Sequence, residues 1–267
     1  ALDLLNAYTY YYLAQVYQKL EEPKKSAQCC HKSLSKQLEL KEYQALEWAT
    51  NSATLSHHYI AHENFRAAKI HLAAATYVME RYKQDLESRE FGENEEGEKE
   101  ELLETLKKCE ADIARSWGKY TLVLLQASLD EILDQESSNS GVSMLQGGTA
   151  SMRVEDIEQG EDTITVPNEN EVAESHDFPS IEMDSDLMAI SANKCKNFEE
   201  SRSIFLPGKR FFNKAKTIYY TLHEHCTDYA EIQQDLSQMH KVLIHFEEFL
   251  FKLILRRSRL SNEEYAE

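Results

Sequence analysis

The sequence contains few glycines and prolines, the residues that form the turns between β-strands. It has eight Gly and four Pro in 267 residues, and neither type occurs between residues 24 and 91. Tight hairpins and strand ends depend on such residues. The apolar side chains recur every three or four positions, which is the period of a helix and not of a strand. We therefore expect an all-α protein.

Paired cysteines, a secretory signal and long hydrophobic runs are also missing. The five cysteines are odd in number and include no C-x-x-C motif, which predicts a reduced, cytoplasmic environment. No apolar run is long enough to span a bilayer, so we expect no membrane insertion. The sequence begins without Met and within a helical apolar pattern, and we expect it to be part of a longer repeat protein.

Basic residues are scarce. The chain has 47 acidic and 29 basic residues, a net charge of −18. Residues 136–200 hold 15 acidic and 3 basic residues, so this segment accounts for −12 and the other 202 residues for −6. Binding of nucleic acid needs clustered Lys and Arg, and we expect none. The acidity favours a basic protein partner; the alternative is a charged run that only keeps a loop soluble.

Two stretches of the chain match each other at a shift of 42 residues. The shared pattern has a large, a small and an aromatic residue in one helix, followed by a small, a large and a small residue in the next. In tetratricopeptide repeats, such small residues let two antiparallel helices approach, and the large ones fill the gaps. The matching pairs are Leu13 with Leu55, Ala14 with Ser56, Tyr17 with Tyr59, Ser26 with Ala68, Cys30 with Leu72 and Ser33 with Ala75. We expect a tetratricopeptide-like helical-repeat solenoid with elongated helices, an architecture that usually binds other proteins.

The apolar period predicts two helix pairs followed by one long helix. We expect helices at residues 3–20, 24–40, 42–62 and 64–90, the last with Asn64 as its N-cap. A fifth helix at residues 99–134 would be about 54 Å long. Within it, Trp117 and Gly118 take the large and small places of the repeat. We interpret Gly118 as a close helix crossing and not as a hinge.

A polar segment interrupts the third helix pair. Residues 137–191 combine Ser, Gly, Glu and Asp with single hydrophobic residues and no sustained period, so they cannot bury enough apolar surface to become ordered. We expect helices again at residues 209–226 and 227–257. The predicted organisation is helical repeats at 1–136, a long disordered acidic loop at 137–200, and a continuation of the solenoid at 201–267.

Signatures of catalysis are missing. The sequence has no phosphate-binding glycine loop, no nucleophile elbow and no H-E-x-x-H motif. His58 and His62 lie one helical turn apart without further ligands, and the run His-Glu-His-Cys at residues 223–226 lies at a predicted helix end where alternate residues diverge. Cys29 and Cys30 lie among small residues of a helix, as packing groups do. We predict no enzyme, no metal and no cofactor.

Tyrosines near the start of the chain are candidates for a binding surface. Four of them fall between residues 8 and 12 and must point in several directions around one helix, so they cannot all enter one core. With Leu13 and Tyr17 facing inward, the concave side of the helix would carry Tyr8, Tyr11, Gln15 and Gln18, with Tyr12 at its margin. Tyr and amide side chains are typical of protein-recognition surfaces; packing against a neighbouring repeat is the alternative. Tyr11 and Gln15 replace the Lys and Asn that clamp a carboxylate in repeats of chaperone co-factors, so we do not expect an acidic-tail-binding co-chaperone.

Two segments carry a likeness to a known family. Residues 4–17 have the sequence LLNAYTYYYLAQVY, and residues 207–216 have the sequence PGKRFFNKAK. With the 42-residue helix pairs and the acidic insertion, they resemble the central part of the kinesin family binding proteins. The resemblance implies a non-enzymatic regulator that binds kinesin motor domains and blocks their attachment to microtubules, with effects on microtubule organisation, axonal transport and neuronal development.

The resemblance also implies which residues contact the motor. They lie on the concave helices and are Tyr12, Gln15 and Gln37, with Tyr8, Gln18 and His57 as further candidates. Tyrosines would give apolar contact and a hydroxyl group, and glutamines would form hydrogen bonds. Expected partners are kinesin motor domains and, as further candidates, other cytoskeletal proteins, in a cytoplasmic, cytoskeleton-associated setting. The alternative is a general helical-repeat scaffold that assembles protein complexes without motor inhibition.

Overall fold

The computed structural model describes residues 2–92, 95–141, 176–222 and 226–264. In these ranges the chain forms helices and no strands, which confirms the all-α prediction. The helices are α1 (Leu2–Lys19), α2 (Pro23–Leu40), α3 (Ala45–Ala61), α4 (Phe65–Ser88), α5 (Glu96–Gly141), α6 (Ser185–Ala189), α7 (Phe198–Thr221) and α8 (Cys226–Glu264). The first four agree with the predicted ranges to within three residues at each end.

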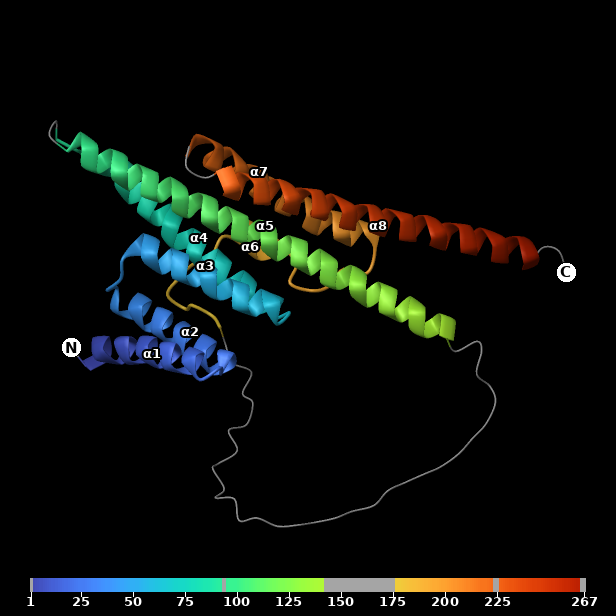
Figure 1. Ribbon diagram of the computed structural model, residues 1–267, viewed down its shortest axis with the longest axis horizontal. Coiled ribbons are helices and arrows are strands. Elements are labelled where there is room, and N and C mark those ends of the chain that lie inside the picture. The colour runs from blue at the N-terminus through green and yellow to red at the C-terminus, as the bar shows by residue number, and fades with distance from the viewer. Residues whose placement is uncertain (1, 93–94, 142–175, 223–225, 265–267) are drawn as a thin grey trace, which may run out of the picture.

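The 42-residue repeat is visible in the backbone of the two hairpin turns. Glu21 and Glu63, which are 42 positions apart, both adopt left-handed backbone angles, with φ of 59° and 56°. The next residue donates its N–H to the repeat tyrosine in each case: Glu22 to Tyr17 O and Asn64 to Tyr59 O, both at 2.9 Å. The α1–α2 and α3–α4 hairpins are therefore copies of one unit, stacked side by side (Figure 1).

Small residues close the α1–α2 hairpin. Ala7 and Ala14 have 1% and 3% of their surface exposed, and their carbonyl groups accept hydrogen bonds from Ser33 Oγ at 3.0 Å and Ser26 Oγ at 2.9 Å. The predicted inward position of Leu13 is wrong, because this side chain is 37% exposed. Its repeat partner Leu55 is covered from the α2 side, whereas no described helix covers the corresponding side of α1.

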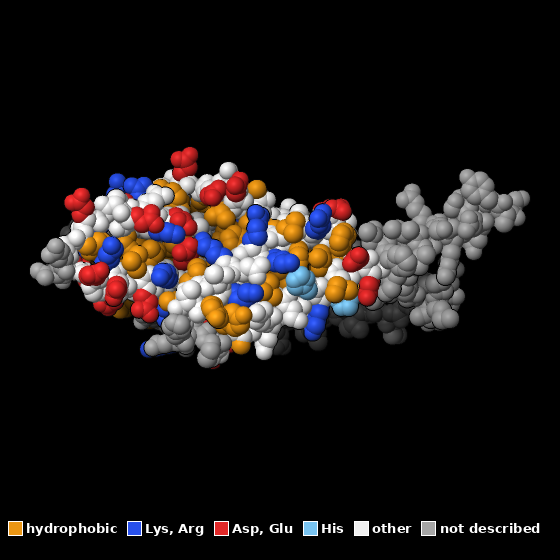
Figure 2. All heavy atoms as spheres, turned by 90° about the horizontal axis from the view of Figure 1, so that it is seen from above, with side chains coloured by type: hydrophobic (Ala, Val, Ile, Leu, Met, Phe, Trp, Pro, Cys, Tyr) orange, Lys and Arg blue, Asp and Glu red, His pale blue; other side chains and the backbone are white. Residues whose placement is uncertain are grey.

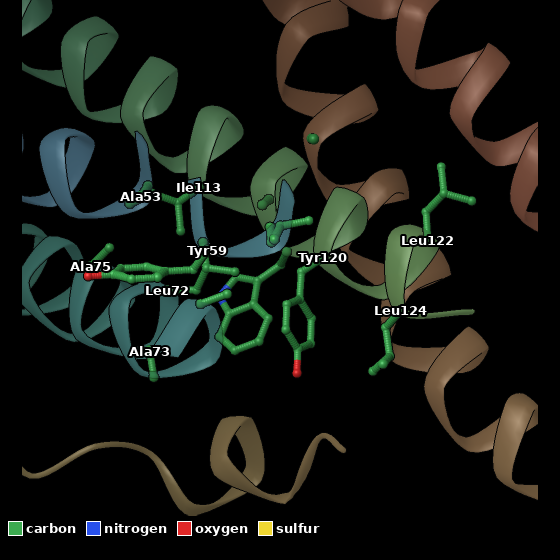
Figure 3. Packing of buried hydrophobic residues seen from close by; sticks show 14 of the residues in the cluster. Ala53, Tyr59, Leu72, Ala73, Ala75, Ile113, Tyr120, Leu122 and Leu124 are labelled. Carbon is green, nitrogen blue, oxygen red and sulfur yellow. The ribbon is translucent and has the colours of Figure 1, made fainter. Parts of the chain in front are cut away.

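Helix α5 is the central helix of the described structure. It packs against α3 and α4 on one side and against α7 and α8 on the other (Figure 1). The core where α3, α4 and α5 meet includes Tyr59, Leu72 and Tyr120 (Figure 3). At Gly118 a Cβ atom would lie 2.6 Å from the Phe212 ring of α7. The predicted close helix crossing is confirmed.

Helix α7 begins eleven residues before its predicted start at residue 209, so the predicted start is wrong. Asn197 caps the helix by accepting a hydrogen bond from the Glu200 N–H at 2.9 Å, and Pro207 lies inside it. A Cβ atom on Gly208 would lie 2.1 Å from Thr121 Oγ1 and 2.7 Å from Met239 Cε. Glycine at this position is therefore required by the contact of α7 with α5 and α8.

The predicted disordered loop at residues 137–200 is too long at both ends. Residues 137–141 belong to α5, and residues 142–175 lie outside the described residues. Residues 176–197, the return segment, pack on the helices and include α6. Phe178 and Cys195 are only 2% and 3% exposed. The single hydrophobic residues of this segment have no period of their own, but they bury themselves against the surface that α4 and α5 already provide.

Polar contacts attach the return segment to the helices as well. Lys69 Nζ on α4 donates to the carbonyl oxygens of Met188 at 2.9 Å and Ile190 at 3.0 Å. Tyr120 on α5 donates its hydroxyl hydrogen to Ser191 O at 2.7 Å. These bonds satisfy backbone groups of a segment that has few hydrogen bonds of its own. Among the described residues, no helix is both long and apolar enough to cross a bilayer.

Candidate protein-binding groove

A groove with a volume of about 780 Å³ runs between the two hairpins. We call it the α1–α3 groove, because α1 and α2 form one wall and α3 forms the other; the two parts of the first wall are called the α1 wall and the α2 wall. The α1 wall, with the turn that follows it, presents Tyr8, Tyr11, Tyr12, Gln18 and Glu21, and α2 begins at the groove with Pro23. The α2 wall presents Ser26, Ala27, Cys30, Ser33, Leu34 and Gln37, and the α3 wall presents Glu47, Asn51, Thr54, Leu55 and His58.

The tyrosines of α1 are open to solvent at the mouth of this groove. Tyr8, Tyr11 and Tyr12 are 51%, 46% and 62% exposed, and the rings of Tyr11 and Tyr12 meet edge to face at 5.5 Å. Exposed rings with a free edge for a partner bring a large apolar area and a hydroxyl group at low entropic cost. The α1 wall is therefore suited to contact with another protein.

Apolar and uncharged polar groups make up most of the groove. Ala27, Leu34 and Leu55 are buried at its base, while the α3 wall adds a polar stripe at helical spacing, with Asn51 and Thr54 in its middle. Burial raises the pKa of the Cys30 thiol, so this side chain is a poor nucleophile at neutral pH. The arrangement provides apolar and polar surface for contact with a partner.

The charge of the groove is negative. Its described lining includes the carboxylates of Glu21 and Glu47 and no Lys or Arg. Other parts of the surface differ, since Lys and Arg side chains gather along the middle of the face seen in Figure 2, between hydrophobic and acidic ones. The negative charge at the groove is thus a local property and does not simply follow from the net charge of the chain.

The structure brings four of the six predicted site residues together. Tyr8, Tyr12, Gln18 and Gln37 line the α1–α3 groove. Gln15 is exposed on α1, seven residues after Tyr8 and hence on the same side of the helix, but outside the lining residues. The four predicted residues that line the groove lie on the α1 and α2 walls, and none of them lies on the α3 wall.

His57 lies apart from the other five. Its Nε2 atom is 3.0 Å from Ser116 Oγ on α5, so the ring packs toward α5 and not into the groove. Burial, with the nearby Lys119 and Arg115, lowers the pKa of this histidine. Glu47, Asn51 and Thr54 of α3 line the groove but were not among the predicted site residues, although their helical spacing marks a polar stripe in the sequence.

The histidine and cysteine candidates give no metal site in the described part of the chain. The rings of His58 and His62 are tilted against each other with their centroids 4.3 Å apart, and one nitrogen of His62 lies 2.8 Å from His58 O. No group of three or more described His, Cys, Asp and Glu side chains is arranged to hold a metal ion. The candidate at residues 223–226 lies outside the residues whose side chains are described.

These features define a class: an all-α protein of stacked helical hairpins with an open, acidic groove suited to a protein partner. Residues 46–256 match the family described as "KIF-1 binding protein C terminal". Since this match covers most of the sequence, the chain belongs to that family. The family resemblance of the sequence is thereby confirmed.

Several relatives in the family are similar along almost the whole chain. The proteins called "KIF-binding protein" of Danio rerio and Drosophila melanogaster are 36% and 32% identical over 252 and 247 residues, or 93% and 92% of this chain. That of Homo sapiens is 34% identical over 239 residues, 89% of this chain. The chain spans 38%, 38% and 36% of the lengths of these three relatives.

A solved structure has the same fold. The structure described as "Cryo-EM map of KIFBP" aligns with a TM-score of 0.51 and 24% sequence identity, over 100% of this chain and 46% of that one. The predicted fold class is confirmed by this likeness together with the helical hairpins.

Proposed function

We propose that this chain binds the motor domain of a kinesin in the α1–α3 groove and thereby blocks attachment of the motor to microtubules. The relatives called KIF-binding protein support a kinesin partner. The observation that carries the proposal is the lining of the groove, in which exposed tyrosines and amides are combined with carboxylates and with no described Lys or Arg.

Charge complementarity gives the proposal its physical basis. The microtubule surface is acidic, so the surface by which a motor grips it must be basic. A groove with carboxylates in its lining can cover that surface and compete with the microtubule. Tyr8 and Tyr12 would supply the apolar contact area, and Gln18 and Gln37 would form hydrogen bonds to the motor.

The proposed cellular role follows from this competition. A protein that keeps kinesins off their track would act on microtubule organisation and axonal transport and, through them, on neuronal development. It would do so in the cytoplasm, near the cytoskeleton, as a non-enzymatic regulator that needs no cofactor and binds no nucleic acid. A general scaffold would differ in one respect, because it would leave the bound motor on the microtubule.

The test combines a binding assay with co-sedimentation of motor domains and microtubules. In the triple variant Tyr8→Ala, Tyr12→Ala, Gln37→Ala, truncation of residues central to an interface should weaken motor binding by about 100-fold or more. The matched control is Tyr220→Ala, because Tyr220 is 74% exposed on α7, away from the groove. Gln15→Ala, made separately, decides whether this predicted contact belongs to the surface.

Three outcomes are informative. If the triple variant stays folded and still binds motor domains at full strength, the groove is not the binding surface. If the wild-type chain binds motors and they still pellet with microtubules, the scaffold alternative is correct. Movement of the motors to the supernatant by the wild-type chain and the Tyr220 control, but not by the triple variant, supports the proposal.

A further inference from the structure

The two walls of the α1–α3 groove belong to different hairpins that touch each other little. Helices α1 and α2 pack along their lengths, as do α3 and α4, but α2 and α3 meet only over a short stretch. The Cα atoms of α2 and α4 are nowhere within 8 Å of one another. The width of the groove is therefore set by the few side chains that cross from one hairpin to the other.

The described hydrogen bonds between the two hairpins include one from α3 to α2 and one between α2 and α4. Trp48 Nε1–H on α3 donates to Leu34 O on α2 at 3.1 Å. His31 on α2 and His71 on α4 are joined through Nδ1 and Nε2 at 3.2 Å. The side chains that form both bonds are in contact with Phe178 of the return segment.

The tautomers of the histidine pair follow from Ser52 on α3. Its hydroxyl has one hydrogen, which it donates to His71 O at 3.0 Å, so at 3.1 Å it can only accept from His71 Nδ1–H. His71 Nε2 then carries the lone pair and accepts from His31 Nδ1–H. A fully buried, neutral His71 thus links α2, α3 and α4 in one chain of bonds.

Phe178 of the return segment fills the space where these three helices meet. Its ring centroid lies 5.1 Å from His31, 5.1 Å from His71 and 5.5 Å from Trp48. It therefore contacts one aromatic side chain from each of α2, α4 and α3. The ring is 2% exposed and comes from outside both hairpins, two residues after His176, which also contacts His31 at 5.3 Å.

We propose that Phe178 is a positioning residue for the α1–α3 groove: by joining α2 to α3 and α4 it fixes the spacing of the two walls at which a partner is bound. Because aromatic side chains in edge contact hold a defined geometry, removal of the ring takes away contacts with all three helices and leaves the α1–α2 hairpin less firmly attached to α3 and α4. This inference rests on the proposed function only for its binding readout.

The experiment compares Phe178→Ala with Leu187→Ala in the full chain. Leu187 is an apolar residue of the same return segment, but it packs with α6 against α4 and does not contact α2. In Phe178→Ala, amide hydrogen exchange in α1 and α2 should become at least about tenfold faster, while the α5 core around Trp117 keeps its protection. Leu187→Ala should leave α1 and α2 unchanged. Motor-domain affinity should fall by about tenfold in Phe178→Ala alone.

The exchange measurement needs no motor, so the two hypotheses fail in different ways. Unchanged exchange in α1 and α2, or an equal rise in α5, overturns the positioning role. Selective loosening with unaltered affinity, in a chain that binds motors, overturns it too. A wild-type chain that binds no motor refutes the proposed function, and the exchange data still decide whether Phe178 holds the hairpin. If Phe178→Ala does not fold, Phe178→Leu gives the same comparison with a smaller expected rise.

Discussion

Substitution of Gly118 by alanine tests how closely α5 and α7 must approach. A Cβ atom at this position would lie 2.6 Å from Cδ1 and Cε1 of Phe212, whereas ordinary van der Waals contact begins at 3.4 Å. Phe212 has no exposed surface, so its ring cannot move into solvent. Alanine favours a helix over glycine by about 1 kcal/mol, but overpacking costs about 1–3 kcal/mol. We expect a net destabilisation of about 1 kcal/mol.

The same helix offers a matched control. Gly97 also lies in α5, and a Cβ atom there would meet nothing within 4 Å. Gly97→Ala should therefore raise the free energy of unfolding by up to about 1 kcal/mol through helix propensity alone. Urea unfolding followed by far-UV circular dichroism should move the midpoint up for Gly97→Ala and down for Gly118→Ala. Equal stabilisation by both substitutions would refute the argument from close approach.

A second substitution tests whether the Phe212 ring causes the destabilisation by Gly118→Ala. In a Phe212→Leu background the smaller side chain leaves room for a methyl group at position 118, so Gly118→Ala should cost less there than in the wild-type chain. Coupling between two residues in contact is typically about 0.5–3 kcal/mol. The same cost in both backgrounds would mean that the loss of stability does not arise from the Phe212 ring.

Three further predictions concern protons and salt. Burial, followed by the nearby His31 and His176, lowers the pKa of His71, while an unfolded histidine titrates near 6.5. The unfolded state then binds more protons below about pH 6.5, so the urea midpoint should be level above about pH 7 and fall toward pH 5.5; a level midpoint throughout would contradict this. Tyr219 donates its hydroxyl hydrogen to the Asp112 carboxylate, so Tyr219→Phe should lower the free energy of unfolding by about 1–3 kcal/mol, whereas the same change at the exposed Tyr220 should not. Motor binding should weaken as salt rises, mainly through a slower association rate in stopped-flow measurements.

The hairpins could be predicted from the sequence because their determinants are local. The 42-residue shift placed small residues such as Ala14 and Ser26 where α1 and α2 pack together, and there Ser26 Oγ donates a hydrogen bond to Ala14 O. Asn64 was recognised as a cap from its position alone, and it accepts from Ala67 N–H at 3.2 Å. Each of these features depends on residues a few positions apart or on the neighbouring helix of the same hairpin.

The features that escaped prediction depend on contacts distant in sequence. The return segment has no periodicity, and Phe178 is buried by side chains of α2, α3 and α4 that are distant from it in sequence. Gly208 resembles a helix break until α5 is in place with Thr121 against it. The direction of His57 likewise follows from α5, since its partner Ser116 lies 59 positions further along the chain. No local pattern contains this information.

The α1–α3 groove stays open although apolar surfaces on facing walls tend to come together. Leu34 and Leu55 lie at its base, but Gln37, Asn51 and Thr54 line it above them. Closing the groove would remove these polar groups from water without giving each a partner, at a cost of about 1–3 kcal/mol per group. In the positioning role proposed for Phe178, its contacts with α2, α3 and α4 limit opening in the other direction. The groove is thus preformed, and a partner that enters it loses little free energy to ordering of the walls.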